Sequence, residues 1–231
     1  MTMNGHTARV SGLCAVLVLV ACGTDTPSAP PPPITIAVFT GNNQMEQVTT
    51  RLAPIRVIAT RLGNPEEDVA VTWSATGGTV NPTSTVTANG GIASTTWDLP
   101  SVAGTYTVQA SAAEASNSPV TFSATALPGP PTAMTKGEGD GQSGPVNTTL
   151  PTNLQVAVED AYRNPLAGLT ITWSVTSGAA TVTPITPQTD ANGISAAQVL
   201  LGATPGPITV MASASVVLQG APAVFDLTAT P

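Results

Sequence analysis

The sequence has little charge of either sign and few aromatic rings. Charged residues make up 8% of the 231 residues and aromatic residues 3%, whereas a typical soluble domain is about 25% charged. The formal net charge is −7, and the chain holds only six Lys and Arg residues. Six basic residues cannot form the phosphate-neutralising surface that nucleic-acid binding requires. The composition therefore excludes nucleic acid as a partner, and it disfavours electrostatic binding to anionic lipid.

Histidine and cysteine are almost absent. The only histidine is His6, and the two cysteines are Cys14 and Cys22. A chain without histidine beyond its first residues lacks the usual base of a Ser or Cys triad. It also lacks the imidazole and thiolate ligands of zinc, iron and copper sites. We therefore predict that the protein is not an enzyme and that it holds no metal and no cofactor.

Carboxylates are the remaining candidates for acid–base chemistry or for calcium binding. Neighbouring residues of a strand point to opposite faces, so adjacent acids share a site only if a turn reorients them. We interpret these carboxylates as solvated turn residues. They occur at Glu66-Glu67-Asp68, at Glu138 and Asp140, and at Glu159-Asp160.

Threonine and proline are abundant. The chain has 37 Thr and 22 Pro residues, and 42% of its residues are hydrophobic. Branching at Cβ makes Thr and Val suit half-buried strands, and proline recurs too often for long helices. The composition predicts an all-β protein.

The N-terminus predicts export. Met1–Arg9 is polar, and Val10–Ala21 is an apolar stretch of 12 residues. A bilayer needs about 20 apolar residues, so this stretch suits the core of a signal peptide spanning residues 1–21. It ends in Leu19-Val20-Ala21-Cys22, which resembles the lipobox of bacterial lipoproteins. The resemblance implies cleavage before Cys22 and attachment to the membrane through acyl chains on Cys22. The alternative is an ordinary signal peptide followed by an incidental cysteine.

Residues 22–33 are predicted to be the lipidated cysteine and a Pro-rich linker. Gly23 after the cysteine resembles the sorting pattern of outer-membrane lipoproteins, although the pattern does not decide between the cell surface and the periplasmic face. Pro30–Pro33 are four consecutive prolines, which favour polyproline II and a stiff spacer of about 3.1 Å per residue. The alternative is a PxxP ligand for an SH3-like domain.

The rest of the chain contains a tandem sequence repeat with two copies. Thr72-Trp73-Ser74 recurs as Thr172-Trp173-Ser174, and Gly91-Ile92 recurs as Gly193-Ile194. The offset grows from 98 to 103 along the chain, as expected when small insertions fall in loops. The repeat predicts two domains, at residues 34–127 and 129–231.

Each copy alternates apolar and polar residues, with turn signals every 8–12 residues. About seven such short strands predict an immunoglobulin-like β-sandwich. Both copies also resemble bacterial Ig-like domains of group 1, the invasin/intimin repeat type. In the second copy the resemblance lies in Val158–Pro165, Ile171-Thr172-Trp173-Ser174, Thr189–Ala196 and Ile208–Ala212. In the first copy it lies in Gly63-Asn64-Pro65, Val71-Thr72-Trp73-Ser74, Asn89–Ala93 and Gly104–Ala110, with a departure at Thr60-Arg61-Leu62. It implies a stalk, adhesion or interaction module.

The equivalent aromatic residues of the two copies are predicted to form the structural core. Trp73 matches Trp173, and Phe122 matches Phe225. A carbohydrate-binding module displays such rings as a stacking platform, whereas an Ig-like sandwich buries them. Their repetition inside an apolar alternation favours the core. Arg51, Arg56 and Arg61 alternate between sheet faces, and we interpret them as solvated.

These features predict a lipid-anchored protein of the cell envelope, in which tandem Ig-like domains serve as a structural stalk or an adhesion module. Its partner is an unknown protein or glycan. The alternative is a polysaccharide- or ligand-binding lipoprotein that uses the loop tips of the domains.

Overall fold

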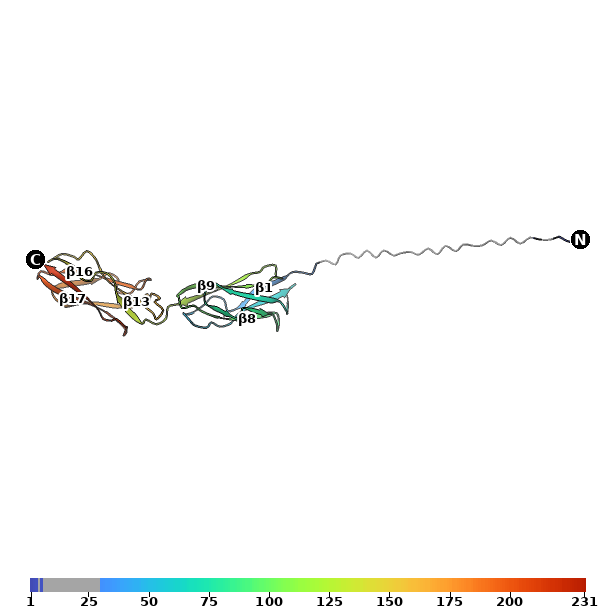
Figure 1. Ribbon diagram of the computed structural model, residues 1–231, viewed down its shortest axis with the longest axis horizontal. Helices are drawn as coiled ribbons and strands as arrows, with labels where there is room; N and C mark the ends of the chain where they lie inside the picture. Colours follow the sequence, from blue (N-terminus) through green and yellow to red (C-terminus); the bar gives the residue numbers. More distant parts are fainter. Residues whose placement is uncertain (4, 6–29) are drawn as a thin grey trace. The chain divides into compact units, whose positions relative to one another are not determined.

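The computed structural model describes residues 1–3, 5 and 30–231, and in this part every regular element is a β-strand (Figure 1). No helix among the described residues has the length and apolar character needed to cross a membrane. His6, Cys22 and nearly all of the expected signal peptide lie outside the described residues. Lipidation of Cys22 therefore stays a prediction.

The first sandwich consists of two sheets of five strands each. One sheet has the order β1-β3-β8-β6, with β4 also paired to β3, and the other has the order β2-β10-β9-β5-β7. The strands are β1 (Ile34–Thr40), β2 (Gln44–Gln47), β3 (Ile55–Arg61), β4 (Asn64–Pro65), β5 (Ala70–Ala75), β6 (Thr79–Asn81), β7 (Ser84–Val86), β8 (Ile92–Asp98), β9 (Gly104–Ser111) and β10 (Val120–Leu127).

The second sandwich repeats this arrangement with four strands in each sheet. The orders β11-β13-β16-β15 and β12-β18-β17-β14 are those of the first sandwich without β4 and β7. The all-β class and the Ig-like sandwich fold are thus confirmed. The strands are β11 (Ala133–Lys136), β12 (Ser143–Pro145), β13 (Leu154–Glu159), β14 (Ile171–Ser177), β15 (Ala180–Pro184), β16 (Ile194–Leu201), β17 (Gly206–Ala214) and β18 (Ala223–Thr230).

Each sandwich has its own hydrophobic core. One cluster of buried residues lies within Ile34–Ala126, and the other lies within Met134–Ala229. The long strands around them alternate over much of their length, as in β18, where Ala223, Phe225, Leu227 and Ala229 are buried and the residues between them are more exposed. Because side chains alternate across a strand, this pattern gives each sheet one face in the core and one in solvent.

The first segment of each sandwich passes from one sheet to the other at a glycine. Strand β1 pairs with β3, whereas β2 pairs in parallel with β10 of the opposite sheet. Gly41 lies between them with φ +88, and a Cβ there would be 2.6 Å from the Pro54 carbonyl oxygen. Gly139 has the same role in the second sandwich, with φ +92 and 2.6 Å to the Asn153 carbonyl oxygen. Glycine is the residue type that tolerates both this backbone angle and this close approach, because it has no Cβ.

A glutamine fixes each crossing. Gln44 donates its side-chain amide to the carbonyl oxygens of Gly41 and Ala53, at 2.7 and 2.9 Å. Gln142 donates in the same way to Gly139 and Thr152. The repeated Gly-x-x-Gln sequence therefore allows the first segment of each sandwich to contribute one strand to each of the two sheets.

The predicted core aromatics lie side by side on the inner face of one sheet. The ring centroids of Trp73 and Phe122 are 6.0 Å apart, and those of Trp173 and Phe225 are 5.6 Å apart. In the central strand, alanine stands opposite each tryptophan, Ala110 beside Trp73 and Ala212 beside Trp173. The small residue leaves room for the indole. All four rings are buried.

The Trp173 indole also joins the two sheets, because its N–H donates to Ser195 Oγ of β16, at 3.1 Å. We expect Trp173→Ala to lower the free energy of unfolding of the second sandwich by about 3–5 kcal/mol, since it leaves a core cavity. Urea denaturation checks this. Val217→Ala removes a fully exposed apolar side chain from the same sandwich and is expected to change stability by less than about 0.5 kcal/mol. A loss below about 1 kcal/mol for Trp173→Ala would contradict the buried position of this ring.

Gly139 and Gly141 offer a matched pair of substitutions. Both have positive φ, but a Cβ at Gly141 meets nothing within 4 Å. Gly141→Ala is therefore expected to cost only the left-handed backbone penalty of about 1–2 kcal/mol. Gly139→Ala should cost clearly more, because its Cβ collides with the backbone of Asn153 and Leu154. Equal costs in thermal unfolding would show that the crossing does not need this close approach.

Candidate functional site

The turn after β13 differs from its sequence-based prediction. Asp160 was expected to be a solvated turn acid, but it is 3% exposed. This prediction is wrong for Asp160 because the turn Asp160–Pro165 folds back over the carboxylate, with Arg163 at φ +66. Glu159 stays in β13 beside it, half exposed. The two acids therefore do not form a paired site.

The Asp160 carboxylate accepts four hydrogen bonds. Its Oδ1 accepts from the backbone N–H groups of Tyr162 and Asn164, at 2.8 and 2.9 Å. Its Oδ2 accepts from the backbone N–H of Gly129 and from the side-chain amide of Asn164, both at 2.8 Å. Burial by itself raises the pKa of Asp160, but these hydrogen bonds outweigh it, so that the pKa is lowered from its ordinary value.

Asn164 carries the contact from this turn to the first sandwich. Its side-chain amide donates to the Ser101 carbonyl oxygen at 2.8 Å, and its Oδ1 accepts from the Ala103 backbone N–H at 2.8 Å. Asn164 is 4% exposed. Sequence reasoning missed this role of Asn164, since Asn-Pro indicates only a turn.

Asp140 and Glu67 also make contacts within the fold. Asp140 pairs with Lys136 and accepts from the Asp226 backbone N–H at 2.9 Å, and the hydrogen bond from Lys136 is the main cause of its lowered pKa. Glu67 accepts from the Gly90 backbone N–H at 3.0 Å. No group of three or more His, Cys, Asp or Glu side chains with metal-binding geometry occurs in the described part of the chain.

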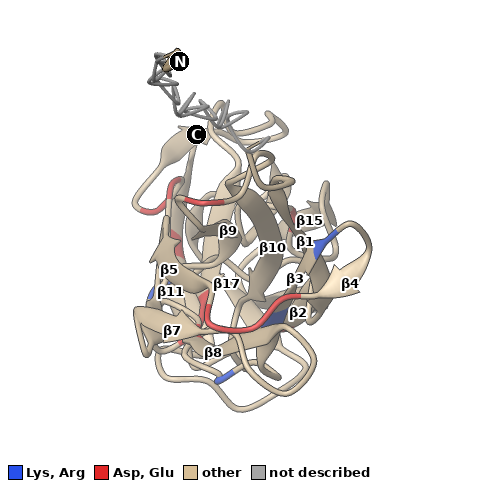
Figure 2. Ribbon diagram, turned by 90° about the vertical axis from the view of Figure 1, so that its right-hand side faces the viewer, with Lys and Arg blue, Asp and Glu red and all other residues tan. Residues whose placement is uncertain are grey.

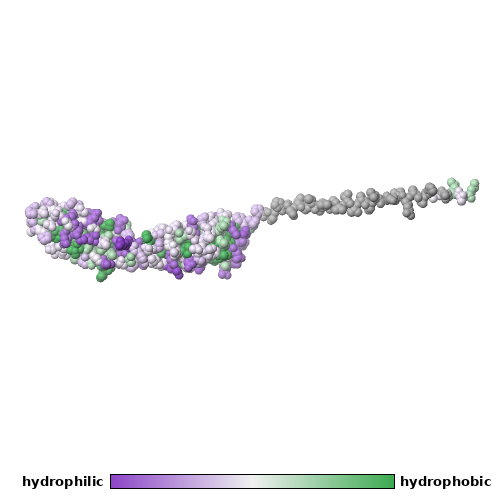
Figure 3. All heavy atoms as spheres, in the orientation of Figure 1, coloured by the Kyte–Doolittle hydropathy of each residue, from purple (hydrophilic) through white to green (hydrophobic). Residues whose placement is uncertain are grey.

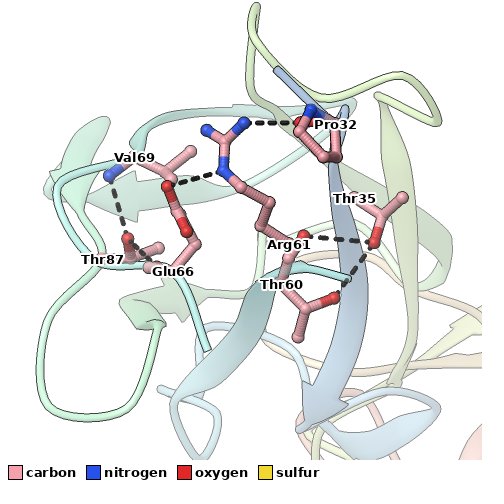
Figure 4. Close-up of polar contacts among 7 residues, drawn as sticks. All are labelled: Pro32, Thr35, Thr60, Arg61, Glu66, Val69 and Thr87. Carbon is pink, nitrogen blue, oxygen red and sulfur yellow. Dashed lines mark hydrogen bonds and ion pairs between the residues drawn. The ribbon is translucent and has the colours of Figure 1, made fainter. Parts of the chain in front are cut away.

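Two of the three arginines predicted to be solvated are paired. Arg51 donates two hydrogen bonds to Asp98, at 2.7 and 2.9 Å, and lowers the pKa of that carboxyl group. Arg61 pairs with Glu66 at 3.0 Å and donates to the Pro32 carbonyl oxygen (Figure 4). The spacing of the arginines revealed neither partner. Charged residues remain sparse among uncharged ones (Figure 2).

Asp160→Asn tests the turn. An amide at this position presents an N–H₂ group where Gly129 and Asn164 donate, so we expect the second sandwich to lose about 1–3 kcal/mol at neutral pH. The pKa is lowered in the folded state, so the stabilisation is present above the ordinary Asp pKa of about 3.9 and is lost as the pH falls through the folded value. The difference in unfolding free energy between wild type and variant should therefore shrink in acid.

Asp190→Asn is the matched control for this prediction. Asp190 Oδ1 alone accepts from the Asn192 and Ile194 backbone N–H groups, and the residue is exposed. An asparagine can keep both bonds, and we expect a smaller loss. Equal losses from both substitutions, or a pH-independent difference for Asp160→Asn, would contradict the role assigned to the buried carboxylate.

Comparison with known proteins places the second sandwich in a family. Residues 145–225 match the family model of the bacterial Ig-like domain (group 1). Among solved structures, InvD of Yersinia pseudotuberculosis matches with a TM-score of 0.56 and 18% identity, over 86% of this chain and 57% of that chain. The Escherichia coli adhesin FdeC matches with a TM-score of 0.49 and 18% identity, over 86% of this chain and 65% of that chain.

This chain thus spans less than two thirds of either solved protein. No curated protein matches it. The likeness to InvD shows the fold. The family model matches the sequence of the second sandwich at residues 145–225. The chain therefore carries a bacterial Ig-like domain of group 1 at residues 145–225, preceded by a sandwich with the same strand order.

Proposed function

We propose that the protein is a non-enzymatic, lipid-anchored component of the bacterial cell envelope, and that its tandem Ig-like domains form a stalk or an adhesion and protein-interaction module. The observation that carries this proposal is the order of parts along the chain. A lipobox-like Leu19-Val20-Ala21-Cys22 and a Pro-rich spacer precede two Ig-like sandwiches, one of which matches the group 1 family. Acyl chains on Cys22 attach the protein to the outer membrane, since several chains anchor stably where one is marginal.

The strand pairing of each sandwich supports a load-bearing role. Strand β2 lies near the start of the first sandwich and pairs in parallel with β10, its last strand. A pull on the two ends of the sandwich slides these strands along each other, so that all their hydrogen bonds resist together. Strands β12 and β18 repeat the arrangement in the second sandwich. A stalk needs this resistance.

The alternative of glycan binding has less support. All three tryptophans are buried, so none offers a ring face to a sugar. On the face seen in Figure 3, hydrophobic residues are scattered among hydrophilic ones and form no broad platform. A protein partner is therefore the better proposal.

Membrane fractionation tests the anchor. We expect the wild type to sediment with the outer membrane and to incorporate labelled palmitate, and Cys22→Ala to lose both the label and the membrane association. Cys14→Ala is the matched control, because Cys14 lies inside the segment that cleavage removes, and it should behave as the wild type. Protease treatment of intact cells then shows which face of the membrane carries the module.

Two results would contradict the proposal. Membrane association of Cys22→Ala equal to that of the wild type would remove the lipid anchor. Equal loss of label from Cys14→Ala and Cys22→Ala would show that Cys22 is not the specific acceptor.

A further inference from the structure

The loop before β9 in the first sandwich is held by the turn after β13 in the second. Asn164 Nδ2 donates to the Ser101 carbonyl oxygen, and Asn164 Oδ1 accepts from the Ala103 N–H, both at 2.8 Å. One side chain thus satisfies a donor and an acceptor of the same backbone loop. Both bonds are shielded from water, because Asn164 is nearly fully buried.

Asp160 sets the orientation of that side chain. The Asn164 amide nitrogen has two hydrogens, and it donates to Ser101 and to Asp160 Oδ2. With both donors used, the side-chain oxygen can point only toward Ala103. Asp160 is therefore a positioning residue, and a carboxylate at position 164 would face it as a like charge.

The same carboxylate also holds the segment that connects the sandwiches. Gly129 is buried and donates its backbone N–H to Asp160 Oδ2 at 2.8 Å. A Cβ at Gly129 would lie 3.4 Å from that oxygen, in van der Waals contact with it. The connecting segment and the first sandwich are thus both tied to one turn of the second sandwich.

Both copies have an asparagine at the position of Asn164, but the residues around it differ. Thr60 replaces Asp160 in the first copy, and the equivalent Asn64 is exposed. In the second copy Pro205 stands where the first has Ala103, before the matching Gly206 and Gly104. Proline has no N–H to donate. The reverse contact, from Asn64 of the first copy to the loop before β17 of the second copy, would therefore lack its N–H donor.

We propose that Asn164, Ser101 and Ala103 form an interdomain latch, positioned by Asp160, which makes the two sandwiches move as one body. In this latch, the Asn164 side chain binds the backbone of Ser101 and Ala103 in the same chain. The latch is independent of the lipid anchor, since its residues all lie beyond the spacer. A stalk transmits force and position only if its domains do not swivel, so the latch goes beyond the proposed function by supplying rigidity.

Nuclear spin relaxation of backbone ¹⁵N tests the latch on residues 30–231, which include every residue of both hydrophobic cores. In the wild type we expect one rotational correlation time for both sandwiches. In Asn164→Ala the two sandwiches should tumble separately, with shorter correlation times, and the Ala103 amide should exchange its hydrogen roughly five- to tenfold faster.

Two further variants keep the test decisive. Ala103→Pro removes the donor on the first sandwich without altering the second, at a position where the other copy already has proline, and it should also uncouple the sandwiches. It settles the question if Asn164→Ala fails to fold. Asn64→Ala alters the equivalent exposed asparagine and should leave a single correlation time.

The latch is overturned if the wild-type sandwiches tumble separately. It is also overturned if both Asn164→Ala and Ala103→Pro keep one common correlation time. In that case the contact exists, but the connecting segment alone sets the coupling.

Discussion

Both sandwiches depend on filling the space between two sheets with few large side chains. Aromatic residues are only 3% of the chain, yet each core places a tryptophan and a phenylalanine side by side on the inner face of one sheet. The central strand contributes alanine opposite the indole, so a wide ring and a small residue share one layer. Such a layer is closely packed, and the alternation of buried and exposed residues in strands such as β13 and β18 follows from it.

Charged residues are scarce, and several of the carboxylates that are present hold the fold by accepting hydrogen bonds. Asp98, Asp140 and Asp160 each accept hydrogen bonds that lower the pKa. A carboxylate that bonds to backbone N–H groups closes a turn more firmly than a neutral side chain, because bonds to ionised groups are stronger. The few acids therefore define turns, and threonine serves the sheet surfaces, as where the Thr35 and Thr60 hydroxyls meet at 3.1 Å (Figure 4).

The sequence was sufficient to predict what lies within one sandwich. Alternation in Leu154–Val158 and the repeated Thr-Trp-Ser indicated the strands and the fold, since burial of one face imposes a period of two. The sequence was insufficient where a residue's surroundings are formed by residues far away in the sequence. Asp160 looked like any turn acid, and only Gly129 and the folded-back Asn164 amide bury it. Arg51 likewise pairs with Asp98, 47 residues away.

The differences between the copies follow from what precedes each sandwich. In the first, Arg61 at the end of β3 donates to the Pro32 carbonyl oxygen, and Glu66 holds the guanidinium. In the second, Asn164 after β13 donates to Ser101, and Asp160 holds the amide. Both turns thus use a donor fixed by a carboxylate to bind the backbone ahead of their sandwich. Core positions such as Trp73 and Trp173, or Phe122 and Phe225, are constrained by packing and stay alike, while this turn is constrained by its neighbour and changes with it.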